Sequence, residues 1–117
     1  MVDIDKLIKE ALSPLDLPIY GYMPDFGKDE PSEYIVYSYY DTPQLFADNT
    51  EHALEYTVRI DLFTQSPKPT LERAVKKNMK SKNFIYQGST SRDVTTTYPG
   101  KYRKNQEYKI TFKEEKE

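Results

Sequence analysis

The sequence contains no cysteine, which excludes a disulfide framework, a thiolate nucleophile and any cysteine-based metal site. Its single histidine is His52, so histidine metal sites and most schemes of general acid–base catalysis lack their usual groups. The four glycines form no phosphate-binding loop and no dinucleotide-binding pattern. No apolar run approaches the roughly 20 residues that cross a membrane, and no export signal is visible. We therefore expect a protein of a cytosol-like compartment, without membrane contact.

The polar residues that remain do not combine into a recognisable catalytic or metal site. His52 follows Glu51 at the start of a predicted strand, where a solvated or capping imidazole is the ordinary case. A turn-rich segment carries the acidic residues Asp25, Asp29, Glu30 and Glu33. These lack the spacing of a calcium loop, which favours a solvated acidic turn. The hydroxyl residues at 89–91 have no base that could activate them. We expect no enzymatic activity, no cofactor and no metal.

Tyrosine is abundant where other apolar residues are scarce. Only 37% of the 117 residues are hydrophobic, so a single domain of this length must have a thin core, and 11 tyrosines supply much of its aromatic surface. A tyrosine buries a large ring while its hydroxyl keeps a polar partner, which suits half-exposed sheets and protein interfaces.

Apolar periodicity predicts two helices and six strands. Residues 53–63 alternate apolar and polar side chains without a break, which is typical of a strand with one buried and one solvated face. Residues 4–12 and 70–81 carry helical apolar stripes, with Asp3 or Asp5 as cap of the first helix, Thr70 as cap of the second, and Ser13-Pro14 as the end of the first. The other predicted strands are 18–22 at a sheet edge, 33–40, 84–86, 93–98 and 107–113, with turns at 88–91 and 99–100.

These elements predict an α+β fold in the order α-β-β-β-α-β-β-β, with a mixed, mostly antiparallel sheet covered on one face by two helices. One domain spans 1–117, with frayed residues at 114–117. A flexible connection at 41–52 is longer than a hairpin needs and contains Leu45 and Phe46. These two side chains either anchor a partner or fold back over the end of the sheet.

The charge is distributed unevenly along the chain. Residues 1–58 carry twelve acidic and three basic residues, whereas residues 59–117 carry seven acidic and fourteen basic ones, and the net charge is −2. The fold either mixes the two halves and cancels the asymmetry, or keeps them apart and makes a bipolar protomer. A bipolar protomer favours head-to-tail contacts between copies.

Basic residues near aromatic rings raise the alternative of a module that binds single-stranded nucleic acid. Two groups have this character, Lys76, Lys77, Lys80 and Lys82 with Phe84 and Tyr86, and Lys101, Arg103 and Lys104 with Tyr98 and Tyr102. A negative net charge and the lack of an RNA-binding signature oppose this interpretation, and a solvated lysine-rich helix face is the plain alternative.

The layout as a whole resembles the tail terminator proteins, also called tail completion or tail-to-head joining proteins, of long-tailed bacteriophages and prophages. The resemblance is based on the order of the elements. A short helix leads into residues 17–20, and a strand at 34–37 precedes a long polar connection. A strand at 56–63 then ends in small polar residues at 64–66 and is followed by a second helix and a final strand that contains tyrosine. It spans nearly the whole chain as a pattern of elements and departs from the family in the polar segment 90–103.

The resemblance implies a structural protein of the virion, without enzymatic activity, that forms a hexameric ring at the head–tail junction after assembly in the host cytoplasm. Such a ring caps the tail tube, contacts the head connector or completion protein, and lets DNA pass through its lumen without specific binding. Self-contact and partner contact are then expected at Leu45, Phe46, Asp48, Glu51, Arg73, Lys77, Lys80, Tyr102 and Arg103. In isolation the chain either forms oligomers that depend on concentration or is a monomer that closes into a ring on its tail partner.

Overall fold

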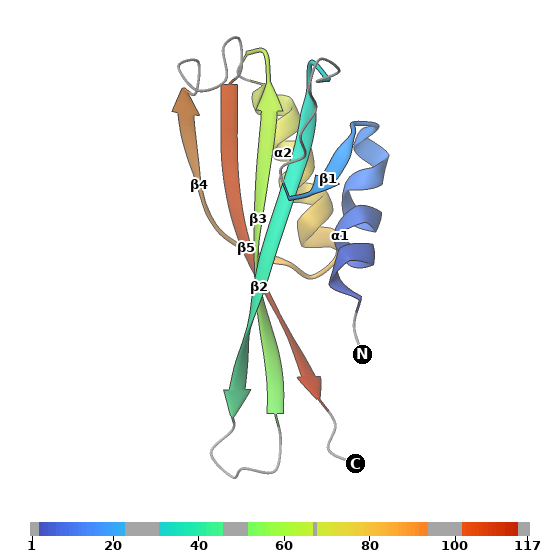
Figure 1. Ribbon diagram of the computed structural model, residues 1–117, viewed down its shortest axis with the longest axis vertical. Helices are drawn as coiled ribbons and strands as arrows, with labels where there is room; N and C mark the ends of the chain where they lie inside the picture. Colours follow the sequence, from blue (N-terminus) through green and yellow to red (C-terminus); the bar gives the residue numbers. More distant parts are fainter. Residues whose placement is uncertain (1–2, 23–30, 46–51, 67, 94–101, 115–117) are drawn as a thin grey trace.

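A five-stranded mixed sheet forms the centre of the molecule, and two helices pack on one of its faces (Figure 1). The computed structural model describes residues 3–22, 31–45, 52–66, 68–93 and 102–114. The strand order is β1 (Ile19–Gly21), β2 (Tyr34–Leu45), β3 (His52–Thr64), β5 (Tyr102–Glu114) and β4 (Ile85–Asp93). Strand β1 pairs parallel with β2, and the other neighbours pair antiparallel. The predicted α+β class with two helices over a mixed sheet is confirmed.

Helix α1 (Ile4–Leu12) begins and ends where the sequence predicts. The Asp3 side chain accepts a hydrogen bond of 3.1 Å from the Lys6 backbone N–H, so Asp3 is the cap, and the negative charge lies at the positive end of the helix dipole. The apolar stripe is buried at Ile4, Ile8, Ala11 and Leu12. A short 3₁₀ turn with proline at its second position then ends the helix.

The core lies between the helices and the sheet. The inward side chains of β3, Val58, Ile60 and Leu62, are almost fully buried, and α2 (Pro69–Ser81) adds Val75 and Met79. Alternate residues of β3, among them Arg59, point to the opposite face of the sheet. The alternation seen in the sequence therefore describes the buried face, whereas the opposite face is only partly solvated, because Thr57 and Phe63 on it are buried.

Strand β2 extends further than its sequence predicts. It continues from Tyr40 to Leu45, and its last residue pairs with His52 of β3. The expected twelve-residue connection at 41–52 is therefore wrong for 41–45 and for His52, and the intervening residues 46–51 lie outside the described residues. The strong strand β3 provides a complete hydrogen-bonding edge, which overrides the poor strand propensity of Asp41 and Pro43.

The second half of the chain differs from prediction in three places. The turn expected at 88–91 is wrong, because one strand, β4, runs through it with a bulge between Tyr86 and Gly88. This single strand includes residues 85–86 of the strand predicted at 84–86 and Asp93 of the strand predicted at 93–98. The described residues therefore contain five strands, and residues 94–98 lie outside the described part. Strand β5 begins at Tyr102, five residues before the predicted start.

The cap predicted for the second helix is also wrong. Helix α2 begins at Pro69, and Lys68 occupies the cap position without a side-chain hydrogen bond. Proline is well tolerated as the first helical residue, because its missing N–H would have no partner there and its φ is already helical. The proline therefore determines the start of this helix, and Thr70 lies inside it.

Candidate interaction surfaces

The order of the strands keeps the two halves of the chain on different sides of the molecule. Strands β1 and β2 lie on one side of β3, and β5 and β4 lie on the other (Figure 1). The helices follow the same division, since α1 contacts β1 and α2 contacts β4. Among described residues, the part before Arg59 holds seven acidic and two basic residues, and the rest holds five acidic and twelve basic ones. The strand order therefore favours the bipolar interpretation, although the pairs of Lys68 with Glu33, Lys82 with Glu10 and Lys109 with Glu55 cancel part of the asymmetry between the halves.

On the acidic side, one carboxylate fixes α1 to the sheet. Asp5 in the first turn of α1 accepts hydrogen bonds from the hydroxyls of Tyr37 at 2.7 Å and Tyr39 at 2.6 Å, both on β2. The bond from Tyr39 and then that from Tyr37 hold the pKa of Asp5 below its usual value. The same bond raises the pKa of Tyr39 to about 12, and burial together with Asp5 raises the pKa of Tyr37. The three groups form a charged bridge between helix and sheet.

On the opposite side, a polar relay attaches α2 to the sheet. The hydroxyl of Tyr108 on β5 donates a short hydrogen bond to the Gln106 side-chain oxygen, and the amide of Gln106 donates to the backbone carbonyl of Glu72 at 3.0 Å. Tyr108 is fully buried, and burial raises its pKa. Each helix is thus held by buried tyrosines as well as by apolar packing, and tyrosine contributes to the core more than the sequence predicted.

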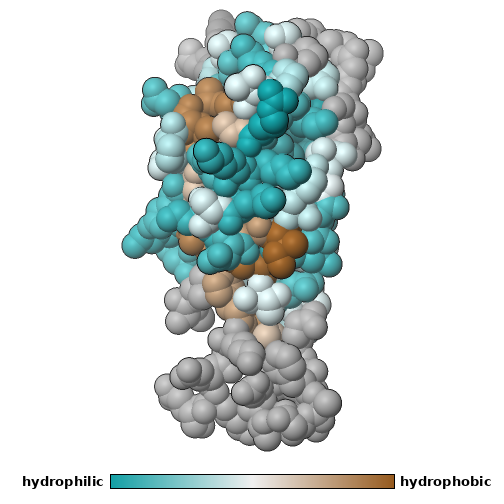
Figure 2. Space-filling model, turned by 180° about the vertical axis from the view of Figure 1, so that it is seen from behind, coloured by the Kyte–Doolittle hydropathy of each residue, from teal (hydrophilic) through white to brown (hydrophobic). Residues whose placement is uncertain are grey.

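Helix α2 presents a row of exposed cations. Arg73, Lys77 and Lys80 recur at helical spacing and are solvent-exposed, and Figure 2 shows hydrophilic side chains over most of the helix-covered side. Beside them, Lys76 places its ammonium 4.0 Å from the centre of the Tyr86 ring. A hollow of about 520 Å³ adjoins this row, lined by Lys76, Lys80, Asn83, Phe84, Ile85 and Tyr86.

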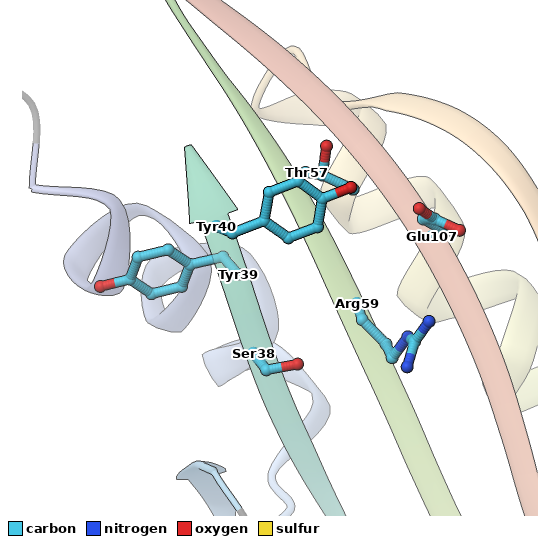
Figure 3. A pocket seen from close by; sticks show the side chains of 6 residues that line it. All are labelled: Ser38, Tyr39, Tyr40, Thr57, Arg59 and Glu107. Carbon is cyan, nitrogen blue, oxygen red and sulfur yellow. The ribbon is translucent and has the colours of Figure 1, made fainter. Parts of the chain in front are cut away.

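The sheet face without helices has two parts, a small apolar cluster of Tyr34, Val36 and Phe63, and a polar part with ion pairs between neighbouring strands. Arg103 lies 3.6 Å from Asp61, and Lys109 lies 3.6 Å from Glu55. A hollow of about 190 Å³ on this face is lined by Ser38, Tyr39, Tyr40, Thr57, Arg59 and Glu107. Figure 3 shows Arg59 extending toward β5, the strand that carries Glu107, while Tyr39 points to the other side of the sheet. The face combines both charge signs, and the residues lining its hollow include no base positioned against Ser38 or Thr57.

The predicted partner residues that the structure describes lie in three separate places. Arg73, Lys77 and Lys80 lie together on α2, and Tyr102 and Arg103 begin β5 opposite Thr64 and Phe63. Leu45 ends β2 opposite His52, at the far end of β3 from Thr64. Phe46, Asp48 and Glu51 lie outside the described residues, so the two alternatives for the Leu45–Phe46 pair stay open. Arg103 is half-buried and paired with Asp61, which reduces its availability to a partner.

Sequence reasoning missed three exposed large side chains. Tyr22, Tyr40 and Ile85 are each more than 60% exposed. Tyr22 follows the edge strand β1 and has a left-handed backbone with φ 67°, and Ile85 begins the other edge strand, β4. The strand alternation could have indicated that Tyr40 is exposed. The exposure of Tyr22 and Ile85 depends on which strands lie at the edges of the sheet.

The aromatic part of the nucleic-acid alternative is weaker in the structure than in the sequence. Phe84 is buried in the core, and the face of the half-buried Tyr86 is covered by Lys76. A base cannot stack on a ring that is inside the core or already under a cation. Tyr98 and Lys101 lie outside the described residues.

Among the residues that the structure describes, no three histidine or acidic side chains converge in a way that could hold a metal ion. The two helices described are also too short and too polar to cross a membrane.

Neither a protein-family model nor a curated protein matches the sequence. Among solved structures, the chain is similar to one chain in a structure titled virion of native gene transfer agent particle. The similarity has a TM-score of 0.58 at 10% sequence identity and covers 89% of this chain and 84% of the other. At this identity the match shows a shared fold over nearly the whole length of both chains.

Proposed function

We propose that this chain is a structural protein of a phage or phage-like particle, and that it acts as a tail terminator. In that role, copies of it form a hexameric ring that caps the tail tube and joins it to the head connector. The observation that supports this proposal most is the fold shared, over 89% of this chain, with a chain of a gene transfer agent virion. The bipolar arrangement of charge adds a physical reason for ring formation, because opposite patches on opposite sides favour head-to-tail contacts.

The elongated sheet also provides two ends for two different partners. The β2–β3 hairpin, with Leu45 and His52 opposite one another, forms one end, and Thr64 with Tyr102 lies at the other. In the proposed ring, one end contacts the tail tube protein and the other the head completion or connector protein. Strands β2, β3 and β5 run past α1 at the hairpin end (Figure 1), so this end projects beyond the helical layer.

The proposed ring has no catalytic activity. It assembles in the host cytoplasm and lies at the head–tail junction of the virion. DNA passes through the lumen without specific binding. The lumen is therefore expected to present few of the cations on α2, which instead face neighbouring copies. Partner contacts at Leu45, Phe46, Asp48 and Glu51 belong to the same proposal.

The test is removal of the gene from a host that produces the particles, followed by electron microscopy. Without the terminator, heads and tails should accumulate unjoined, and tail tubes should vary in length because polymerisation has no stop. Mass spectrometry of purified wild-type particles should detect this chain, and labelled antibodies should bind at the head–tail junction. Normal particles in the deletion strain, or particles without this chain, would refute the proposal.

The hairpin end can be tested separately with the double substitution Leu45→Ser and Phe46→Ser. The double variant should impair ring formation and the joining of heads to tails. The urea midpoint of the isolated double variant should equal that of a conservative Leu45→Met control. Unchanged joining with the double variant would remove this end from the mechanism and leave the remaining contacts in place.

The exposed cations Arg73, Lys77 and Lys80 favour a second candidate function, binding of single-stranded nucleic acid. Fluorescence anisotropy with labelled oligonucleotides distinguishes the two. Tight binding by the monomer that weakens steeply with salt would support the second candidate, and binding no stronger than that of an unrelated protein of equal charge would oppose it.

A further inference from the structure

We infer that the basic side of one copy, formed by α2 and the start of β4, binds the acidic side of a second copy, formed by α1, β1 and the adjacent part of β2. This inference rests on the proposed function, because it identifies the surfaces through which neighbouring copies would contact each other in the proposed ring. The basic side is defined here by Arg73, Lys77, Lys80 and Ile85, and the acidic side by Asp3, Asp16, Tyr22 and Asp41.

The basic side carries an electrostatic cost within its own fold. Arg73, Lys77 and Lys80 are spaced four and three residues apart on α2, so like charges are neighbours on one exposed stripe. At the two ends of this region, Lys68 pairs with Glu33 and Lys82 with Glu10, whereas no ion pair joins the three cations of the stripe to another described residue. A partner surface of opposite charge would offset this repulsion.

An apolar contact point lies beside the cations. Ile85 is 63% exposed at the start of β4, next to the hollow of about 520 Å³ whose lining includes Lys80. Protein interfaces typically combine an apolar centre with a charged rim, and an exposed branched side chain beside a hollow matches that anatomy. The hollow is wide enough to admit a side chain from another molecule.

The acidic side carries exposed carboxylates and an exposed aromatic ring. Asp3, Asp16 and Asp41 are exposed, next to the exposed Lys6 and Lys9 of α1, and Tyr22 exposes 61% of its surface at the end of β1. The Tyr22 backbone is fixed by a 2.9 Å hydrogen bond from its N–H to the Tyr37 carbonyl, in a left-handed conformation that tyrosine rarely adopts. An exposed aromatic side chain held in a strained backbone is a suitable anchor for the hollow beside Ile85.

Within one molecule the two sides meet only where α1 contacts α2, near the ion pair of Lys82 with Glu10, and their outer edges lie apart. Strand order places β1 and β4 at opposite edges of the sheet, with three strands between them (Figure 1). A contact between unlike surfaces on opposite sides is heterologous, so each added copy leaves one acidic and one basic side free until a ring closes. A second copy of this chain is therefore the partner whose charge and geometry match both surfaces at once.

The first experiment measures self-association of the full chain by sedimentation equilibrium. Association should weaken between about 0.02 M and 0.3 M salt, because rim charges are screened as the Debye length falls. The triple substitution Arg73→Gln, Lys77→Gln and Lys80→Gln should weaken it about tenfold, given the small contribution of each rim pair. A control with Gln65→Glu, Ser66→Glu and Thr111→Glu changes the net charge equally at exposed positions outside both sides and should associate as the wild type does.

The second experiment exchanges the charges. One variant carries Lys77→Glu and Lys80→Glu, and the other carries Asp16→Lys and Asp41→Lys. Each variant alone has two sides of like sign and should sediment as a monomer. An equimolar mixture should associate again, because each variant then meets the opposite charge on both of its sides. Recovery in the mixture also shows that both variants are folded.

A wild-type chain that remains monomeric at about 1 mM and low salt would overturn the inference, since a complementary pair of surfaces must associate under those conditions. A mixture of the two charge-exchanged variants that stays monomeric, or a triple variant that associates as the control does, would overturn it too. These results are independent of whether purified particles contain the chain, so failure of the inference and failure of the proposed function are distinguishable.

Discussion

The bridge between Asp5 and the two tyrosines offers the sharpest test of how the helical layer is held to the sheet. We expect Asp5→Ala to lower the free energy of unfolding by about 3 kcal/mol. A hydrogen bond to a charged group contributes roughly 1.5–3 kcal/mol, and the half-exposed position of Asp5 places each of its two bonds at the lower end of that range. The substitution also leaves the nearly buried hydroxyl of Tyr37 without its acceptor.

Two further variants separate charge from geometry. Asp5→Asn keeps the shape and one acceptor oxygen but removes the charge, so it should lose about half as much, roughly 1.5 kcal/mol. Tyr39→Phe removes one bond and leaves Asp5 bound to Tyr37, and it should lose about 1 kcal/mol. The losses of Asp5→Ala and Tyr39→Phe should not add, because both delete the same bond. Urea unfolding followed by circular dichroism measures all of them.

The same bridge predicts a pH dependence at both ends of the scale. The pKa of Asp5 is lower in the folded than in the unfolded chain, so its contribution is complete above about pH 4 and is lost as the pH falls through the lowered folded value. The folded pKa of Tyr39 is raised to about 12, so its contribution is complete below about pH 10 and is lost as the pH rises toward 12. The difference in stability between wild type and Asp5→Ala should therefore be greatest between these limits.

A loss below about 0.5 kcal/mol for Asp5→Ala would refute this reasoning, because surface substitutions without a specific role fall within that range. The reasoning would also be refuted if the difference in the free energy of unfolding between wild type and Asp5→Ala stayed constant from pH 7 down to the acid transition. Either result would mean that apolar packing of Ile4, Ile8 and Leu12 holds α1 without help from the bridge.

Three other substitutions test packing and backbone in the sheet, each by urea unfolding. Gly21→Ala should lose about 1–2 kcal/mol, because its Cβ would lie 3.0 Å from the Tyr37 hydroxyl and displace it from Asp5; full stability would mean that the tyrosine adapts freely. Gln106→Leu should lose about 2–4 kcal/mol, since it leaves the buried Tyr108 hydroxyl and the Glu72 carbonyl without partners; a neutral outcome would contradict the relay. Gly88→Ala should lose about 1–2 kcal/mol through its φ of 146° alone, because space for the added methyl is open; no loss would indicate that the bulge relaxes.

Part of this structure follows directly from local sequence patterns. The alternation at 53–63 specifies β3 and its buried face, and the Asp3 cap, apolar stripe and Pro14 specify both ends of α1. These features depend on residues close together in the chain, where hydrogen bonding and side-chain periodicity act within a single element. The α+β class follows from them, because two amphipathic helices need a sheet face to cover.

The sequence did not reveal the lengths of the other strands. Pro43 and Asp41 argue for a loop and Gly88 argues for a turn, yet these residues lie in β2 and β4 because a long neighbouring strand supplies their hydrogen bonds. The same limit applies to Asp5, which the sequence identified only as a possible cap. Its role as an acceptor for Tyr37 and Tyr39 requires a contact across more than thirty residues.

By itself, the sequence determined that the chain lacks the usual catalytic groups, that it forms two helices over a sheet, and that its two halves differ in charge. Only the tertiary structure decided that this difference becomes a difference between two sides of the molecule. The strand order β1-β2-β3-β5-β4 keeps the strands of each half together, so charges of the two halves pair only where the halves meet, whereas an order that alternated the halves would have cancelled more of them. Composition fixes how much charge a chain carries, but non-local strand pairing fixes where that charge lies.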